Sequence, residues 1–258
     1  MHTRSLTEIS ALLASVDASG FPELCNQLRG DTRVGAQRAI QRTKRRLETE
    51  AAEHERLRAL AARECALLDA GALIVAGVDE VGRGALAGPV TACACVFTRD
   101  ADIAGLNDSK KLSPQTRARL DVEIRSVAYD VSVAHVDSRC IDTLGIAEAT
   151  RHAMLQALAG LRTPPDHVLV DGLPVGLGFP TTAVVSGDAT VRAISAASIV
   201  AKVARDLLMV ELDERYPGFG FAGNKGYGSA DHLEAIRAHG PSPVHRLSFG
   251  PCAVNTLF

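Results

Sequence analysis

The chain has 258 residues, of which 47% are hydrophobic and 22% are charged, and its formal net charge is −2. This composition is typical of a globular protein and excludes a chain that is mainly disordered or fibrous. The near-neutral charge gives no overall sign of nucleic-acid binding, so any such role must come from local residues. No apolar segment reaches the length of a membrane span, and the N-terminus lacks the pattern of a signal peptide. Six scattered cysteines without a C-x-x-C pair fit a reducing compartment, so we expect a cytoplasmic protein.

The first seventy residues differ in texture from the rest of the chain. Residues 33–64 contain no proline, many alanines, and arginines interleaved with glutamates, which predicts a solvent-rich helix with opposite-charge pairs. Its leucines form only a partial apolar stripe: Leu57, Leu60, Leu67 and Leu68. The basic cluster at 44–46 is interpreted as a solvated helix face, with phosphate contact as the alternative. We predict a helical, charge-rich extension over residues 1–70.

From residue 72 onward, apolar runs alternate with turns. Strands are predicted at residues 72–81, 90–97, 130–137 and 167–172. In the second of these strands, Cys93 and Cys95 alternate with alanine, which predicts two small buried thiols on one face. The glycine-rich segment 82–88 between the first two strands indicates the turn of a hairpin.

Helical patterns lie between and after these strands. Ser113 and Pro114 have the N-cap and first-turn pattern of a helix start, and Leu120, Ile124 and Val127 follow at the spacing of one helix face. Further helices are predicted over residues 145–161 and 193–216 and around 232–240. A hairpin followed by strands that alternate with helices indicates an α/β domain whose mixed sheet is covered on both faces.

Four carboxylates follow predicted strands. Asp79 and Glu80 lie at the end of the most apolar strand, Asp171 follows the apolar run 168–170, and Asp188 comes after a short loop. Adjacent ionised groups at a strand end are costly unless a cation neutralises them, and Mg²⁺ and Mn²⁺ favour carboxylate oxygens. Carboxylates gathered at strand ends can hold two metal ions for phosphodiester displacement. Taken singly, each has an alternative role, in an arginine pair or as the cap of a turn.

The glycine turn also matches a dinucleotide-binding fingerprint. The segment 82–87 has the G-x-G-x-x-A pattern directly after a strand, and Asp100 lies near the spacing of a ribose-binding acid. That fingerprint must open a helix, however, and here Pro89 is followed at once by a strand-like run. The segment is therefore better interpreted as a hairpin turn.

The string from Asp79 to Gly84, in AGVDEVGRGALAGPV, resembles the signature of ribonuclease HII, the type 2 ribonuclease H of bacteria. Five further strings agree in order and spacing: NDSKKLS at 107–113, VDG at 170–172, SGD with ISAASIVAKVARD at 186–206, KGYGSADH at 225–232 and GPSPVHRLSF at 240–249. The resemblance covers about residues 72–250. Because several of these strings are long, together they are much more specific than any one of them.

The resemblance implies a fold and an activity. The fold would be a ribonuclease H-like mixed five-stranded sheet flanked by helices, with a catalytic domain over 71–215 and a helical, substrate-binding C-terminal part over 216–258. The activity would be hydrolysis of the RNA strand of RNA–DNA hybrids and incision 5′ of ribonucleotides embedded in duplex DNA, leaving 5′-phosphate and 3′-hydroxyl ends. Two divalent metal ions, Mg²⁺ or Mn²⁺, would serve as cofactors, and we expect a monomer without membrane contact.

The resemblance also implies roles for single residues. Asp79, Glu80, Asp171 and Asp188 would be the catalytic, metal-binding carboxylates; the rival for the last role, Asp206, is interpreted as structural. The turn of Gly82, Arg83 and Gly84 would sense the ribose 2′-hydroxyl together with Tyr227. Basic residues in the matching strings would line one groove and contact phosphates: Lys110, Lys111, Lys202, Arg205, Lys225, His245 and Arg246. For Lys202 and Arg205, pairing with nearby acids is the alternative.

The chain departs from the family pattern at two positions and in one region. Ala85 stands where proline is usual, and Thr190 stands where a lysine is common near Asp188, which removes one candidate phosphate contact. The resemblance leaves residues 1–70 unexplained, so we expect them to be dispensable for the chemistry. Another nuclease or an integrase-like member of the same fold, and a non-catalytic nucleic-acid-binding protein, are the alternative functions.

Overall fold

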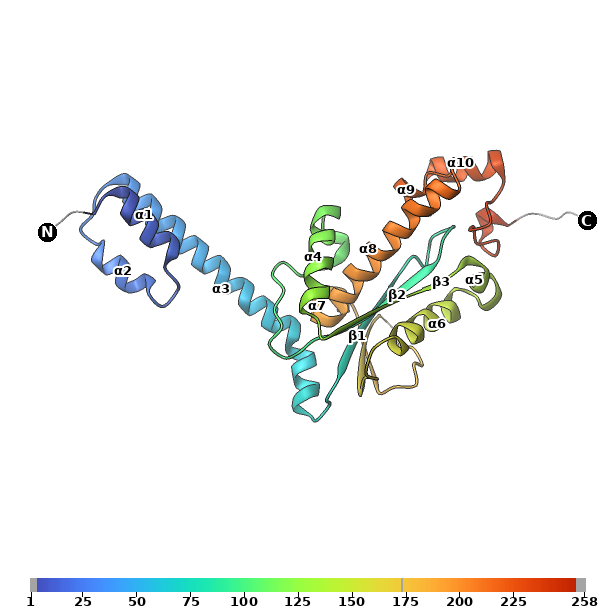
Figure 1. The fold of residues 1–258 in the computed structure, drawn as a ribbon, viewed down its shortest axis with the longest axis horizontal. Coiled ribbons are helices and arrows are strands. Elements are labelled where there is room, and N and C mark those ends of the chain that lie inside the picture. Colours follow the sequence, from blue (N-terminus) through green and yellow to red (C-terminus); the bar gives the residue numbers. More distant parts are fainter. Residues whose placement is uncertain (1–3, 173, 254–258) are drawn as a thin grey trace, which may run out of the picture. The chain divides into compact units, whose positions relative to one another are not determined.

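The computed structural model describes residues 4–172 and 174–253, and its chain divides into two compact units, residues 1–58 and 59–258. The long helix α3 (Val34–Asp69) belongs to both units (Figure 1). The division after Arg58 comes before the boundary that the sequence suggests at residue 70. The reason is that the last part of α3 packs within the second unit, where Leu67 and Leu68 contact a buried cluster with Val75 and Leu169.

The first unit is helical, as predicted for the extension. It consists of α1 (Leu6–Ser15), α2 (Phe21–Gln27) and the first part of α3. Its small core is formed by Ile9, Leu13, Leu24, Leu28, Ala36 and Ala39. The basic cluster at 44–46 pairs along α3, with Lys44 Nζ 3.8 Å from Glu48 and Arg46 3.0 Å from Glu50. These i,i+4 pairs support the interpretation of a solvated helix face.

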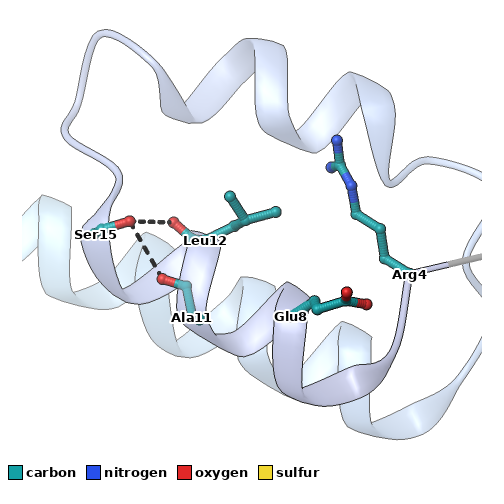
Figure 2. Close-up of a pocket in the computed structure, with 5 residues that line it drawn as sticks. All are labelled: Arg4, Glu8, Ala11, Leu12 and Ser15. Carbon is teal, nitrogen blue, oxygen red and sulfur yellow. Dashed lines mark hydrogen bonds between the residues drawn. The ribbon is translucent and has the colours of Figure 1, made fainter.

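A surface hollow on α1 is lined by Arg4, Glu8, Ala11, Leu12 and Ser15 (Figure 2). Its acidic side chain already has a structural partner, because the Ser5 N–H donates to the Glu8 carboxylate at 2.7 Å and the Glu8 N–H donates to the Ser5 hydroxyl. This reciprocal pair is a capping box that satisfies the free donors at the start of α1. The helix cap therefore accounts for Glu8, the acidic side chain that lines the hollow.

The second unit is built on one five-stranded mixed sheet. The strands are β1 (Val75–Val81), β2 (Val90–Val96), β3 (Asp130–Val136), β4 (His167–Asp171) and β5 (Thr181–Val184). Their order is β3-β2-β1-β4-β5, with β1, β2 and β3 antiparallel and with β4 and β5 parallel to β1. The hairpin turn between β1 and β2 is confirmed, and it excludes a dinucleotide-binding crossover after β1.

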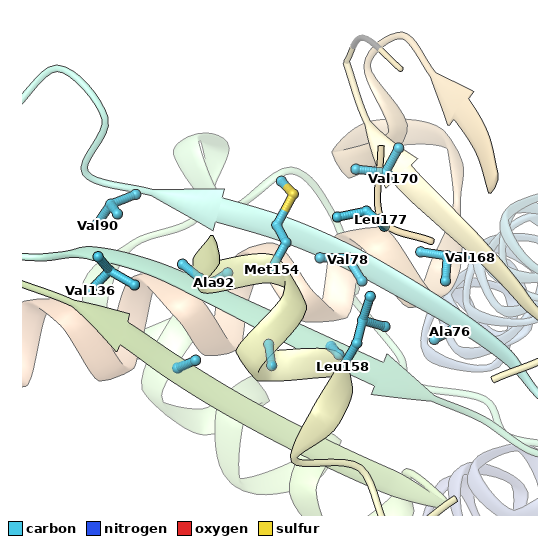
Figure 3. Close-up of a cluster of buried hydrophobic side chains, with 14 of the residues drawn as sticks. Ala76, Val78, Val90, Ala92, Val136, Met154, Leu158, Val168, Val170 and Leu177 are labelled. Carbon is cyan, nitrogen blue, oxygen red and sulfur yellow. The ribbon is translucent and has the colours of Figure 1, made fainter. Parts of the chain in front are cut away.

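Helices cover both faces of this sheet and form the C-terminal part. They are α4 (Pro114–Val127), α5 (Ser138–Leu144), α6 (Ile146–Ala159), α7 (Gly187–Thr190), α8 (Arg192–Arg215), α9 (Phe221–Asn224) and α10 (Ala230–His239), with 3-10 turns at Ser109–Lys111 and Gly250–Cys252. Helix α6 packs on β2 and β3, and α8 packs on β1 and β2. The core between the sheet and α6 includes Val78, Val170 and Met154 (Figure 3). None of the described helices combines the length and apolar character that a bilayer-spanning segment needs.

The sequence prediction succeeds for the long elements and fails for short ones. All four predicted strands are present, Ser113 caps α4 by accepting the Thr116 N–H, and the thiols of Cys93 and Cys95 are buried 3.6 Å apart. The helix α5 and the edge strand β5 were not expected, because seven and four residues are too few to show a hydrophobic period. Val127, expected on the buried face of α4, is 37% exposed at its last position.

A buried ion pair joins α3 to α8 within the second unit. Glu64 accepts hydrogen bonds from Arg192 Nη2 at 2.8 Å and from the Ala193 N–H at 2.8 Å. The side chains of Glu64 and Arg192 are each only 2% exposed. The carboxylate thus meets the first residues of α8, where N–H groups lack helical partners. A chain beginning near residue 70 would lack Glu64 and would leave the Arg192 charge buried.

We expect Glu64→Gln to lower the free energy of unfolding by about 3 kcal/mol, because removal of one buried charge leaves its partner without compensation. Urea denaturation of the full chain measures this loss. Glu48→Gln is the matched control, since its ion pair with Lys44 is exposed and contributes little. Equal stability of the two variants would contradict a structural role for the Glu64–Arg192 pair.

Candidate active site

Two of the predicted carboxylates lie side by side at the ends of parallel strands. Val78 of β1 pairs with Val170 of β4, so Asp79 and Asp171 are the next residues on adjacent strands. Side chains alternate between the faces of a sheet, which directs both carboxylates to the face opposite Val78 and Val170. That face is covered by α8, and Asp79 accepts a hydrogen bond from Ser198 of this helix.

Among the carboxylates of the site, Asp79 is the one whose ionised form is most strongly disfavoured. Its side chain is 6% exposed and accepts the Glu80 N–H at 2.7 Å. Burial raises the pKa of Asp79 well above its usual range, and the negative charges of Glu80 and Asp171 raise it further. Like charges gathered away from water are stabilised either by protonation or by a cation.

Glu80 points to the other face of β1 and borders an open cavity of about 770 Å³. Asp171 and Arg83 line the same cavity, together with the first turns of α6. Arg83 donates to Glu80 at 3.2 Å. Burial raises the pKa of Glu80, and the neighbouring Arg83 guanidinium partly offsets this rise.

Asp188 lies in the short helix α7 and is buried, with one carboxylate oxygen 3.1 Å from Lys110 Nζ. The hydrogen bond to Asp188 raises the pKa of Lys110. The loop before α7 is tied to Asp171, which accepts the Gly187 N–H at 2.7 Å. By contrast, the rival Asp206 lies on α8 and pairs with Lys202 at 2.7 Å in an i,i+4 ion pair. This pairing accounts for Asp206 without any role in the site.

The donor set fits a hard divalent cation. Asp79 and Asp171 face each other's negative charge, and carboxylate oxygens are the ligands that Mg²⁺ and Mn²⁺ favour. In the described residues, no three acidic, histidine or cysteine side chains are already drawn together as a metal site. Two of the four carboxylates are instead paired with cationic side chains, Glu80 with Arg83 and Asp188 with Lys110. Each of these two cationic side chains places a positive charge beside a carboxylate of the site.

The glycine turn and the Tyr227 loop are held together at one edge of the site. The Leu86 and Ala87 N–H groups both donate to the Gly226 carbonyl, at 2.7 and 3.2 Å. Gly82 has φ +88°, and a Cβ there would overlap the Arg205 side chain, so this position requires glycine. The Tyr227 ring is 38% exposed and lies 5.6 Å from the Arg205 guanidinium. Ala85, at the family's usual proline position, donates its N–H to the Gly82 carbonyl.

The structure places the residues of the predicted basic groove in different surroundings. Lys110 and Lys111 are exposed on the 3-10 turn beside Asp188, whereas Lys225 is half-buried and donates to the Ala222 carbonyl at 2.6 Å. Lys202 has the alternative role, in its pair with Asp206. The prediction is wrong for three residues, which are buried and bonded to neighbouring groups: Arg205, His245 and Arg246. Sequence shows that a residue is basic, but the direction of its side chain depends on the packing around it.

A pair of buried histidines, which sequence reasoning did not identify as a pair, supports the Tyr227 loop. His245 Nδ1 accepts the Ser242 N–H at 2.8 Å, so its Nε2 carries the proton and donates to His232 Nε2 at 3.0 Å. His232 Nδ1 in turn donates to the Tyr227 carbonyl at 2.9 Å. This chain of hydrogen bonds requires both rings to be neutral.

Stability should therefore decrease in mild acid. Burial, and then the proximity of His232, lower the pKa of His245 to about 4. The unfolded chain takes up a proton near pH 6.5 and the folded chain does not, so the contribution of His245 to stability is complete above pH 6.5 and decreases as the pH falls toward 4. Melting temperatures of wild type and His245→Gln across this interval measure it. The wild type should show the steeper decrease, and parallel curves would contradict this account.

The comparisons with known proteins agree with this geometry. Residues 76–252 match the family model of ribonuclease HII, and residues 5–67 match the model of the ribonuclease HII N-terminal domain. A ribonuclease HII of Desulfitobacterium hafniense is 44% identical over 248 residues, which are 96% of this chain and 94% of that protein. The extension, which the resemblance left unexplained, thus corresponds to a recognised domain of the same family.

Two solved structures share the fold of the second unit. The ribonuclease H2 of Pyrococcus horikoshii is 29% identical, with a TM-score of 0.59 over 70% of this chain and 95% of that chain. The ribonuclease HII in a complex with PCNA from Archaeoglobus fulgidus is 26% identical, with a TM-score of 0.55 over 72% and 96%.

The mixed five-stranded sheet and its flanking helices place the chain in the ribonuclease H-like fold class. Within this class, the chain belongs to the ribonuclease HII family, and it is a hydrolytic endoribonuclease.

Proposed function

We propose that the chain hydrolyses the RNA strand of RNA–DNA hybrids and incises 5′ of single ribonucleotides in duplex DNA, leaving 5′-phosphate and 3′-hydroxyl ends. The observation that carries this proposal is the pair of adjacent strand ends that bring Asp79 beside Asp171, at the edge of a turn that only glycine fits. Membership of the ribonuclease HII family supports it. The substrate partners are therefore RNA–DNA hybrid and ribonucleotide-containing duplex DNA.

We assign the binding of two divalent metal ions, Mg²⁺ or Mn²⁺, to Asp79, Glu80, Asp171 and Asp188. When bound, such ions supply an activated water and stabilise the leaving 3′-oxygen. Lys110 pairs with Asp188 through a side chain that is 79% exposed, so it can turn toward a phosphate. Lys111 lies on the same 3-10 turn, which Arg117 fixes by donating to the carbonyls of its first residue, Ser109, and of the following residue, Leu112.

Recognition of the sugar is assigned to Gly82, Arg83, Gly84 and Tyr227. Removal of the Cβ at this turn lets backbone groups approach the ribose closely, and the half-exposed Tyr227 ring offers a flat surface beside it. Lys225, next to Tyr227 in sequence, serves to hold this loop through its bond to Ala222 and adds positive charge. In this proposal residues 71–215 carry the chemistry, residues 216–258 carry substrate contacts, and residues 1–70 are dispensable for the reaction.

The two candidates for the fourth carboxylate should separate in activity. We expect Asp188→Asn to lower cleavage by on the order of 10²-fold, the usual cost of one preorganised charged group. Asp206→Asn should stay within about twofold of wild type, because it removes only a helix ion pair with Lys202. Initial rates at saturating Mn²⁺ measure both. The reverse order would assign the role to Asp206.

The cut position tests the proposed reaction. A labelled DNA duplex with one ribonucleotide should be cut once, directly 5′ of that nucleotide. The upstream fragment should end in a 3′-hydroxyl, and the downstream fragment should begin with the ribonucleotide and carry a 5′-phosphate. An RNA–DNA hybrid should also be cut, and the matching all-DNA duplex should stay intact. A cut on the 3′ side, or cleavage of the all-DNA duplex, would instead indicate another nuclease of this fold.

A further inference from the structure

Two arginines of the second unit are fully buried without an ion pair in the described residues. Arg205 and Arg246 are each 0% exposed, and no carboxylate of the described residues lies within ion-pair distance of either guanidinium. Burying a charge without a partner is costly, and burial lowers the pKa of both residues, for Arg246 to about 10. Their donors point to main-chain carbonyls instead.

Arg246 bonds to the turn that follows β1. Its Nη2 donates to the Gly82 carbonyl at 2.7 Å and to the Gly88 carbonyl at 3.0 Å, and its Nη1 donates to the Arg83 carbonyl at 2.8 Å. Its Nε also donates to Gly88, at 3.1 Å. One rigid guanidinium thus holds three carbonyls of the turn, two consecutive ones at its start and one at its end.

The orientation of these carbonyls determines the orientation of the next N–H groups. In a trans peptide the C=O and the following N–H point in opposite directions. The Gly82 and Arg83 carbonyls point toward Arg246, so the N–H groups of Arg83 and Gly84 point away from it. Both Arg83 and Gly84 are exposed. Neither N–H has an acceptor among the described residues. Successive free N–H groups of this kind are suited to bind an oxygen atom of a substrate.

We propose that Arg246 is a positioning residue for ribose recognition, which holds the Arg83 and Gly84 N–H groups toward the sugar. The inference rests on the proposed function and adds the residue that sets its specificity. Lysine cannot replace this arginine, because a single flexible ammonium does not span three carbonyls with fixed geometry. Arg246 touches no substrate itself and acts through the turn.

The segment around Arg246 also supports the other half of the sugar site. The Arg246 N–H donates to the Leu86 carbonyl at 2.8 Å, and the preceding His245 reaches the Tyr227 carbonyl through His232. On its other side, Asp142 accepts the Leu247 and Ser248 N–H groups, each at 2.9 Å. Residues 245–248 therefore join α5 to both the glycine turn and the Tyr227 loop.

A binding ratio tests the inference. In the full chain carrying Asp79→Asn to prevent cleavage, affinity is measured for a duplex with one ribonucleotide and for the same all-DNA duplex. We expect Arg246→Lys to reduce the preference for the ribonucleotide about five- to tenfold, the effect of losing one or two hydrogen bonds. Affinity for the all-DNA duplex should stay within about twofold, since the exposed phosphate contacts are unchanged. Arg192→Lys is the matched control, because it alters a buried arginine that contacts neither loop.

Asp142→Ala provides a second variant if Arg246→Lys does not fold. It loosens the support of residues 247–248 at a position near the surface, and it should reduce the same preference by a smaller factor. An unchanged preference in the folded variants would overturn the inference and leave the proposed function intact, and so would an equal loss of affinity for both duplexes. A parent chain that does not distinguish the two duplexes in binding would overturn the inference; failure of the wild-type chain to cleave the ribonucleotide duplex would overturn the proposed function with it.

Discussion

Asp79→Asn is expected to reduce cleavage of a ribonucleotide-containing duplex by at least about 10³-fold, with the fold intact. Asparagine has nearly the same shape, and its amide oxygen can still accept the Glu80 N–H. It removes, however, one of the negative charges that attract the metal ions. Single-turnover rates in saturating Mg²⁺ measure the loss, and near-normal turnover would contradict the assignment of Asp79.

The same substitution should raise the melting temperature of the metal-free chain at neutral pH by a few degrees. The pKa of Asp79 is raised by burial and by its acidic neighbours, so its ionised form opposes folding at pH values above the unfolded pKa. Asparagine removes this repulsion. Asp121→Asn is the control, because its partner Arg125 lies on the surface of α4, and it should change neither activity nor stability appreciably.

Tyr227→Ala is expected to lower the cleavage rate at a single ribonucleotide by about 10²-fold while metal affinity stays unchanged. The backbone of Tyr227 is held by His232, so the loop should keep its conformation without the ring. The ring can restrict the sugar and align the phosphate, but it offers no ligand to a hard cation. Rates and Mn²⁺ titration calorimetry together separate these two functions.

Tyr129 provides a closely matched control for this variant. It is 46% exposed and stacks with Arg162 at 5.3 Å, compared with 38% exposure and 5.6 Å from Arg205 for Tyr227. Tyr129→Ala should therefore cleave at nearly the wild-type rate. If Tyr227→Ala also cleaves at the wild-type rate, Tyr227 only packs against its neighbours and the 2′-hydroxyl is recognised elsewhere.

The sequence locates the site because its acidic residues follow apolar runs that predict strands. The apolar run before Asp79 and the run before Asp171 each predict a buried strand, and in the structure these strands pair in parallel. Hydrophobic patterns are local, so they identify such elements well. They do not show which face a carboxylate takes, and only the register directs Asp79 toward α8 and Glu80 toward the cavity beside α6.

The basic residues illustrate what sequence could not provide. Arg205 and Arg246 lie in strings that match the family, and their charge suggested phosphate contacts. In the fold their guanidinium groups lie beneath the glycine turn and bind carbonyls from residues 82–89 and 225. The signal that could have suggested burial was the number of glycines and alanines in the turn, whose carbonyls lack regular partners and need donors. Apart from Lys225, the partners are more than a hundred residues away along the chain, beyond any local pattern.

The most direct test of the account is cleavage of a duplex that contains one ribonucleotide, measured in Mg²⁺ or Mn²⁺ and in EDTA, beside the same duplex with deoxyribose at that position. The account predicts cleavage that requires both the ribose and the metal ion. Cleavage that persists in EDTA, or equal cleavage of the two duplexes in Mg²⁺ or Mn²⁺, would contradict it.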